Sequence, residues 1–187
     1  MTGTDWQGQD LGTLERGDSE VTLRYVRRLP HPPEKVWRAL TQAEHLTAWF
    51  PTTVEGELAV GSPLQFSFRE VQIAPMDGMV LSVDPPKLLE FTWGDERLRF
   101  ELTADGAGTL LGFSASFADL AKAARDAAGW HVCLDMLGYG LSGQPAPWTS
   151  DDRWRQVIGA YRASFGPDAS AAGVPPEWED AYGPDEG

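Results

Sequence analysis

Residues 119–143, DLAKAARDAAGWHVCLDMLGYGLSG, decide the fold of this chain. The run is rich in alanine at its start, which favours helix, and it contains no proline. It ends at Gly143, a residue suited to the left-handed conformation that closes many helices. The pattern predicts one long helix, about 35 Å in length if it is continuous.

Two apolar faces run along this predicted helix when its residues are placed at intervals of about 100°. A narrow polar arc between them holds His131 and Asp135, so the second half of the helix should be buried on two sides. This pattern is typical of a helix held inside a curved sheet. The larger face carries Ala123, Ala127, Trp130, Leu134, Leu137 and Leu141, and the opposite face carries Val132, Met136 and Tyr139.

Upstream of this helix, the apolar residues mostly alternate with polar ones, which predicts strands. Residues 20–29 form a first strand. Two short helices follow in tandem, and the second should start at a capping box formed by Thr41 and Glu44. The later strands are joined by connections too short for a parallel crossover, so neighbours should be antiparallel. These strand-like runs are 54–58, 64–71, 79–83, 89–93, 98–102 and 111–117.

The order of these elements predicts an α+β fold. We expect a curved antiparallel sheet of about seven strands around a long C-terminal helix, with two short helices after the first strand. Residues 19–143 should form this domain, and residues 1–18 should be a flexible N-terminal segment because they contain few large apolar groups.

The chain continues beyond the long helix. Residues 144–166 should be a linker followed by an amphipathic helix that docks on the domain, because the apolar residues recur at helical spacing. Residues 167–187 form an acidic tail rich in Pro, Gly and Ala. This tail is either disordered or an extended wrap pinned by Trp178 and Tyr182.

Composition narrows the class of protein. The 187 residues include 42% hydrophobic residues and 8 Trp, and the net charge is −13. The length suits one domain with extensions, and the negative charge argues against nucleic acid or an anionic membrane as partner. Cys133 is the lone cysteine, so no internal disulfide can form. Because neither a signal peptide nor an apolar run of about 18 residues is visible, we expect a cytoplasmic protein.

Five motifs carry a resemblance to a known family. They are PPEKVWRALT (32–41), AEHLTAWF (43–50), LLEFTWGD (88–95), GTLLGFSASF (108–117) and GWHVCLDML (129–137). In this order they resemble START-like, or SRPBCC, domains, and within them the homologues of the C-terminal domain of the ATPase activator of heat-shock protein 90. The resemblance covers about residues 21–143. It implies the helix-grip fold, with a cavity between sheet and long helix.

The sequence lacks the common cofactor motifs. It contains no HExxH or CxxC pattern for zinc, no GxGxxG after a strand and no phosphate-cradling glycine loop with Lys for a nucleotide, and no GxSxG nucleophile elbow. We therefore expect no metal and no cofactor.

Candidate site residues follow from the expected cavity, because a curved sheet around one helix leaves room for an apolar ligand. His131 and Asp135 are one helical turn apart and could form an acid–base pair, but their polar arc favours an ordinary solvated pair. His45 is a further polar candidate, for which an exposed structural role is favoured. The cavity-lining candidates are Trp37, Trp49, Phe66, Trp130, Cys133 and Met136.

The favoured function is a binding module for a small apolar or amphipathic molecule, without chemistry of its own. One alternative is an enzyme of the cyclase or hydratase type that uses an acid or base in the cavity. A chaperone-interacting protein is another. A buried His or carboxylate with a shifted pKa inside the cavity would favour the enzyme, and an extended exposed apolar surface would favour a protein partner.

Overall fold

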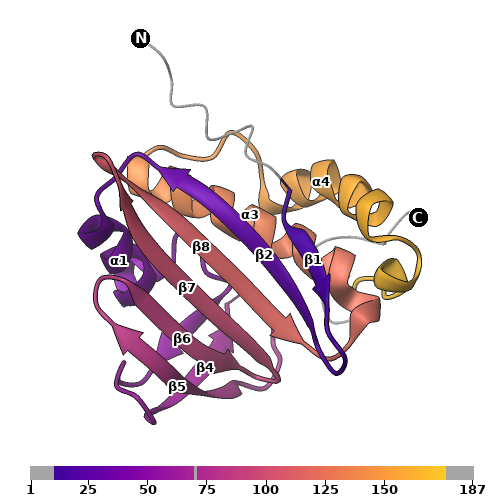
Figure 1. Cartoon of the computed structure of the whole chain (residues 1–187), viewed down its shortest axis with the longest axis horizontal. Helices are drawn as coiled ribbons and strands as arrows, with labels where there is room; N and C mark the ends of the chain where they lie inside the picture. The colour runs from indigo at the N-terminus through magenta and orange to yellow at the C-terminus, as the bar shows by residue number, and fades with distance from the viewer. Residues whose placement is uncertain (1–10, 70, 176–187) are drawn as a thin grey trace.

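The computed structural model describes residues 11–69 and 71–175. Its largest element is one antiparallel sheet of 8 strands in the order β1-β2-β8-β7-β6-β5-β4-β3 (Figure 1). The predicted α+β helix-grip fold is therefore confirmed, with one strand more than expected. The strands are β1 (Thr13–Arg16), β2 (Val21–Leu29), β3 (Thr52–Glu55), β4 (Pro63–Phe68), β5 (Met76–Asp84), β6 (Leu88–Trp93), β7 (Glu96–Asp105) and β8 (Gly108–Phe117).

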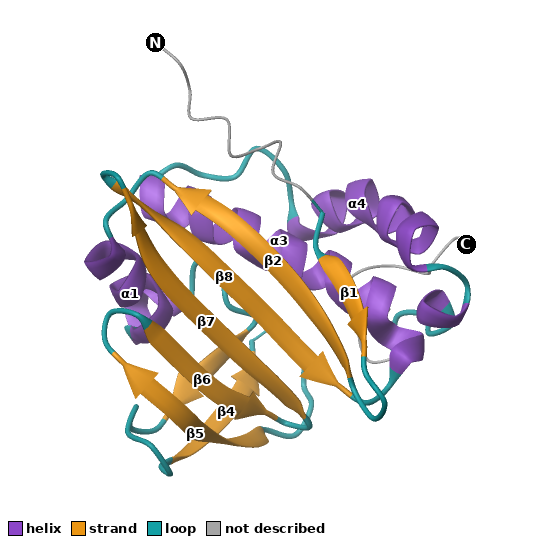
Figure 2. Cartoon of the chain, viewed as in Figure 1, coloured by secondary structure: helices purple, strands orange, loops and turns teal. Residues whose placement is uncertain are grey.

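The helices cover one face of this sheet. In the view of Figure 2, α3 passes behind the strands, and α4 lies beyond β1 and packs against α3. Two short helices, α1 and α2, follow β2 as predicted. The helices are α1 (Pro33–Thr41), α2 (Ala43–Leu46), α3 (Ala123–Ser142) and α4 (Ser150–Phe165), with single 3-10 turns η2 (Leu120–Lys122) and η3 (Asp168–Ser170).

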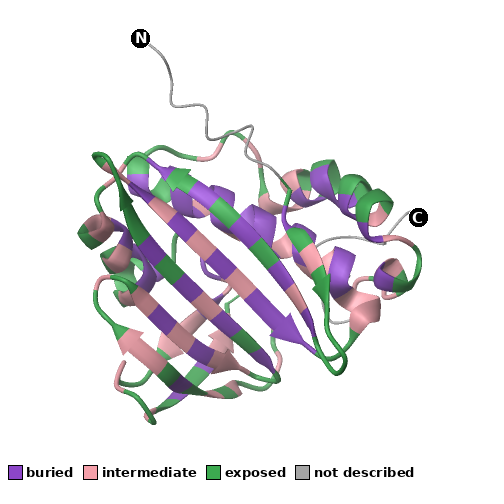
Figure 3. Cartoon of the chain, viewed as in Figure 1, coloured by how far each residue is buried: buried purple, intermediate pink, exposed green. Residues whose placement is uncertain are grey.

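The centre of the sheet joins strands that are far apart in the chain. β2 pairs with β8 from Val21↔Phe117 to Leu29↔Thr109. Side chains alternate between the helix-covered face and the outer face, because successive residues of a strand point to opposite sides. Figure 3 shows this alternation of buried and exposed residues along β2 and β7.

Helix α3 matches the main prediction at its C-terminal end. Gly143 follows its last residue and has a φ of 67°, the left-handed cap that the sequence indicates. The predicted start at residue 119 is replaced by a 3-10 turn. There the Asp119 side chain accepts a hydrogen bond from the Ala121 N–H at 3.0 Å, and α3 itself begins at Ala123.

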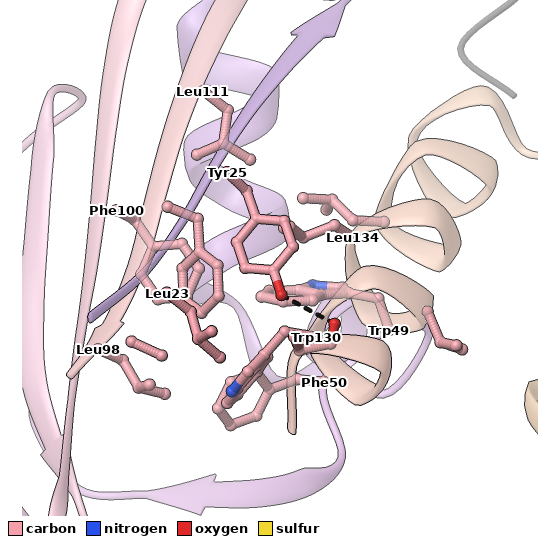
Figure 4. Packing of buried hydrophobic residues seen from close by; sticks show 14 of the residues in the cluster. Leu23, Tyr25, Trp49, Phe50, Leu98, Phe100, Leu111, Trp130 and Leu134 are labelled. Carbon is pink, nitrogen blue, oxygen red and sulfur yellow. Dashed lines mark hydrogen bonds between the residues drawn. The ribbon is translucent and has the colours of Figure 1, made fainter. Parts of the chain in front are cut away.

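An aromatic cluster links the sheet to α3 (Figure 4). The rings of Phe100 and Phe113 lie 4.8 Å apart, and Phe113 lies 5.0 Å from Trp130 of α3. Beside them, the buried Tyr25 hydroxyl donates to the carbonyl of Ala127 at 2.8 Å. Each large side chain buried in this way contributes about 1.5–3 kcal/mol, so the cluster holds the helix firmly against the sheet.

The N-terminal segment differs from its prediction. Residues 1–10 lie outside the described residues, but the residues of β1 form an edge strand rather than a flexible segment. The backbone N–H of Gly12 donates to the Tyr161 hydroxyl at 2.9 Å, and Arg16 donates to the Phe165 carbonyl at 3.0 Å. The flexible-segment prediction is wrong here because α4 supplies partners that no local pattern reveals.

The predicted capping box of α2 is also absent. The N-cap of α2 is Gln42, which makes no side-chain cap hydrogen bond, and Thr41 Oγ1 instead donates back to the Trp37 carbonyl at 2.8 Å. The same motif does occur at α4, where Thr149 and Asp152 form both hydrogen bonds of a capping box.

The segment after η3 returns across the start of α3. The Ala172 N–H donates to the Ala121 carbonyl at 3.0 Å, and Arg125 Nη1 donates to the Gly173 carbonyl at 3.1 Å. The rest of the predicted acidic tail, with Trp178 and Tyr182, lies outside the described residues.

Candidate functional site

A cavity of about 400 Å³ lies between the sheet and α3. Among the described residues, its walls come from seven parts of the chain: the α2–β3 loop, the β4–β5 region, the β6–β7 turn, η2, α3, the first turns of α4 and the segment after η3. Besides the charged groups described below, the lining residues include Trp49, Phe50, Pro51, Phe68, Ile73, Met76, Trp93, Gly129, Trp130, Val132, Cys133, Met136, Ser150, Trp154, Val174 and Pro175.

The indole rings give the cavity a rigid apolar wall. Trp93 and Trp130 meet edge to face with their centroids 5.5 Å apart. The indole N–H of Trp49 donates to the Ala39 carbonyl at 2.9 Å, and that of Trp154 donates to the Arg125 carbonyl at 3.3 Å. Because these N–H groups are already bonded within the protein, the rings offer mainly their apolar surfaces to a ligand.

Charged side chains gather at one end of the same cavity. Lys122 Nζ lies 2.6 Å from Glu96 Oε1 and 3.5 Å from Asp126 Oδ2. Arg125 Nε lies 2.7 Å from Asp126 Oδ1, and the exposed Asp95 also lines this end. The cavity is therefore amphipathic, with a long aromatic wall and a compact polar end.

Glu96 is the most perturbed carboxyl group at this end. Its side chain is 7% exposed, and burial, followed by the charge of Asp126, raises its pKa to about 7 in spite of Lys122. Burial alone would lower the pKa of Lys122, but Glu96 and Asp126 outweigh it and raise that pKa. A carboxyl group with a pKa near neutrality can donate or accept a proton at physiological pH.

Four of the six predicted cavity residues line the cavity: Trp49, Trp130, Cys133 and Met136. The other two do not. Trp37 is half-buried on α1 and packs against the core, and Phe66 is fully buried against Phe91 with the ring centroids 5.7 Å apart. Both residues are apolar and packed inside the protein. A sequence pattern does not reveal the curvature of the sheet, which determines whether an inward apolar residue lines the cavity or lies in the core.

His131 and Asp135 are not the solvated pair that the polar arc suggests. Both are 3% exposed, and His131 Nε2 lies 3.4 Å from Asp135 Oδ2. Arg153 of α4 donates to Asp135 at 2.8 Å, and the Tyr161 hydroxyl lies 2.9 Å from His131 Nδ1. The prediction is wrong because α4 covers this arc with complementary polar groups.

This buried pair forms the interface between α3 and α4, and neither residue is among those that line the cavity. Burial alone would raise the pKa of Asp135, but the hydrogen bonds and charges of His131 and Arg153 outweigh it and lower the pKa. His131 and Arg153 thus hold this carboxylate in its charged form and link α3 to α4.

His45 lies apart from both groups. Its side chain is 51% exposed on α2, where Nε2 lies 3.9 Å from the Glu44 carboxylate. It borders a separate hollow of about 210 Å³ beside Lys35 and Arg38 of α1. The exposed position agrees with the structural role that the sequence favours for it.

The sequence reasoning missed Glu96 and its partner Lys122. A signal for Glu96 was present, because it precedes Leu98 by two residues and so shares the inward face of β7 with Leu98 and Phe100. For Lys122 and Asp126, the spacing of four residues indicates an ion pair, but not the buried carboxylate that it meets.

Comparison with known proteins now identifies the family. The model of the family described as Activator of Hsp90 ATPase homolog 1-like protein matches residues 30–139, which is more than half of the chain. The chain belongs to this family. The Hsp90 ATPase activator homolog-like match includes Glu96, Lys122 and most of α3, whereas α4 and the segment after η3 lie beyond it.

Solved structures of several bacterial proteins share the fold. EF2215 from Enterococcus faecalis, a protein of unknown function, has a TM-score of 0.68 at 21% identity, over 82% of this chain and 91% of its own. CalU16 from Micromonospora echinospora has a TM-score of 0.68 at 23% identity, over 82% and 96%. BPP1335 from Bordetella parapertussis has a TM-score of 0.62 at 26% identity, over 82% and 90%. No curated protein matches the chain.

The described residues also bear on metal binding and on membrane crossing. Within residues 11–69 and 71–175, no group of three or more His, Cys, Asp or Glu side chains is placed to hold a metal ion. In the same part of the chain, no helix combines the length and the apolar character needed to cross a membrane.

Proposed function

We propose that this protein binds a small, largely apolar molecule in the cavity between the sheet and α3. The observation that carries the proposal is the cavity itself, about 400 Å³ in volume and walled by the indole rings of Trp49, Trp93, Trp130 and Trp154. Small-molecule sites are typically clefts of about 300–1,000 Å³ lined by aromatic and apolar groups with a few polar ones. Membership of a family of ligand-binding or activator-like proteins supports the same conclusion.

Met136 provides the experiment that tests this function. Its half-buried side chain lines the cavity from α3, so Met136→Trp should fill the space and block a ligand. We expect the variant to melt at the same temperature as the natural protein or higher, because it adds apolar contact in an empty space. Insertion into close-packed core would instead cost about 1–3 kcal/mol.

A thermal-shift screen of apolar and amphipathic compounds gives the measurement. A compound at 100 times its Kd stabilises the native state by about 2.7 kcal/mol, a shift of roughly 5–10 °C for a chain of this size. Hits should stabilise the natural protein and a Met79→Trp control, where the methionine is 48% exposed on β5, but not Met136→Trp. A destabilised Met136→Trp together with no hit in a broad library contradicts the proposal.

Glu96 favours a second candidate function, proton transfer to or from the bound molecule. Its buried carboxyl group has a pKa of about 7 and lies in the wall of the cavity. A cyclase or hydratase would use such a group as general acid or base, because catalytic groups work best with a pKa near the operating pH. Incubating each screening hit with the protein and with Glu96→Gln, followed by mass spectrometry and NMR, tests for a product that only the natural protein forms.

A further inference from the structure

The polar end of the cavity contains the Glu96 carboxyl group, and the described residues donate a hydrogen bond to only one of its two oxygens. Glu96 Oε1 accepts a hydrogen bond from Lys122 at 2.6 Å. The second oxygen, Oε2, is buried and has no hydrogen-bond partner among the residues that the structure describes. A buried oxygen without a partner costs about 1–3 kcal/mol, so a ligand that supplies a partner gains affinity at this position.

The charged groups around Glu96 determine whether a ligand meets its protonated or its ionised form. From η2, Lys122 is shared with Asp126 and lies over the Phe117 ring at 4.7 Å from its centroid. From α3, Arg125 pairs with Asp126. The β6–β7 turn adds Asp95, and Arg69, after β4, also lines the cavity and donates to the Phe50 carbonyl at 2.7 Å.

In this setting the cation nearest to Glu96 is already engaged by two carboxylates and an aromatic ring. Burial and the charge of Asp126 therefore keep Glu96 about half protonated at neutral pH and largely protonated at lower pH, since its pKa is about 7. A protonated carboxyl group carries one O–H donor. With Oε1 accepting from Lys122, the other oxygen is the position for that donor.

We propose that Glu96 recognises a hydrogen-bond acceptor on the ligand, and that the cavity selects neutral ring compounds with a carbonyl-type oxygen over the matching hydrocarbons and amines. The inference rests on the ligand-binding function proposed above. A hydrocarbon leaves the buried oxygen without a partner. An ammonium group requires the ionised carboxylate and meets the positive charges of Lys122 and Arg125 nearby.

Three compounds with one skeleton test this selection: tetralin, 1-tetralone and 1-aminotetralin. Their dissociation constants are measured by calorimetry at pH 6 and pH 8.5. At pH 6 we expect 1-tetralone to bind about three- to tenfold more tightly than tetralin, the range for one hydrogen bond. At pH 8.5 this preference should shrink, because the ionised carboxylate no longer donates.

Variants of Glu96 separate the donor from the charge. Glu96→Gln keeps a neutral donor, so the preference for 1-tetralone should persist at both pH values. Glu96→Leu removes the donor, so 1-tetralone and tetralin should bind equally. Glu101→Gln, on the outer face of the same strand with its side chain 55% exposed, is the matched control and should leave all affinities unchanged.

Tetralin affinity also reports whether each variant is folded. If Glu96→Leu does not fold, the loss of pH dependence in Glu96→Gln still decides the question. Equal affinities for tetralin and 1-tetralone in the natural protein, a preference retained in Glu96→Leu, or tightest binding of 1-aminotetralin would overturn the inference while leaving ligand binding intact. If none of the three compounds binds at millimolar concentration, the ligand-binding function itself fails, and this inference fails with it.

Discussion

Glu96 couples the stability of the fold to pH. Its pKa is about 7 in the folded protein and 4.5 for an ordinary glutamate, because burial disfavours the charged form. Between these values, the unfolded chain releases a proton that the folded protein keeps. The stability linked to this group is therefore fully present below pH 4.5 and is lost as the pH rises to about 7.

Glu96→Gln should remove this dependence, since the amide stays neutral. At pH 8 the variant should be more stable than the natural protein by up to about 3 kcal/mol, and at pH 4.5 the difference should nearly vanish. Urea unfolding at both pH values measures this change. An equal difference at the two pH values would show that the pKa of Glu96 is the same in the folded and unfolded protein.

His131 should be a strong contributor to stability. Its ring contacts Tyr161, Asp135 and Arg153 in the interface between α3 and α4. His131→Ala removes a buried ring and takes one partner from each of these groups, so we expect a loss of about 2 kcal/mol or more. His45→Ala, at an exposed histidine, should stay within about 0.5 kcal/mol. Chemical denaturation compares the two, and a similar small effect for both would mean that water satisfies the α3–α4 interface.

The residues of the site show where sequence reasoning succeeds. Trp130, Cys133 and Met136 could be assigned to the cavity because the family resemblance implies a cavity against this helix, although the helical period puts Trp130 and Met136 on opposite apolar faces. Asp135 could not be assigned correctly, because a helical period places it on a polar arc but does not reveal that α4 covers this arc. Glu96 was predictable from strand parity alone, but its buried partner Lys122 was not.

At the scale of elements, the N-terminus of α4 depends on a local motif. Thr149 Oγ1 accepts a hydrogen bond from the Asp152 N–H at 3.1 Å, and the Asp152 carboxylate accepts one from the Thr149 N–H at 3.4 Å. Thr149→Ala should cost about 1 kcal/mol, whereas Thr149→Ser should cost little. Thr41→Ala is the control, since Thr41 does not cap α2. A loss at Thr41 equal to that at Thr149 would argue against the cap.

The elements whose own residues show a clear hydrophobic period were predicted best. Helix α3 and β8 carry clear periods of 3.6 and 2, and both were found close to their expected bounds. Strand β1 has only 4 residues with one large apolar group, Leu14, and is held by α4 from the far end of the chain. Such a strand is hard to recognise from its own residues, which carry little apolar pattern. It pairs with β2 from Thr13↔Arg24 to Arg16↔Val21, and Arg16 also donates to the Phe165 carbonyl, 149 positions away.

At the scale of the whole molecule, α4 belongs to the packed structure. Trp154, Val157, Ile158, Tyr161 and Phe165 of α4 are all buried. Truncation after Gly143 removes this cover and exposes the polar groups of α3 and the edge of β1. We expect lower solubility and a lower melting temperature, by calorimetry. A truncated protein that stayed soluble and melted within a degree of full length would show that α4 is dispensable.

The pairing of β2 with β8 bears on how the protein is made. On the ribosome, β2 emerges before its central partner, which ends at Phe117 and follows almost a hundred residues later. At about 5–20 residues per second, this delay is on the order of ten seconds. During that time Leu23 and Tyr25, which the finished structure buries, lack their neighbours in β8, and Tyr25 lacks its partner in α3. The nascent chain therefore passes through a period in which its first long strand needs shielding from other chains.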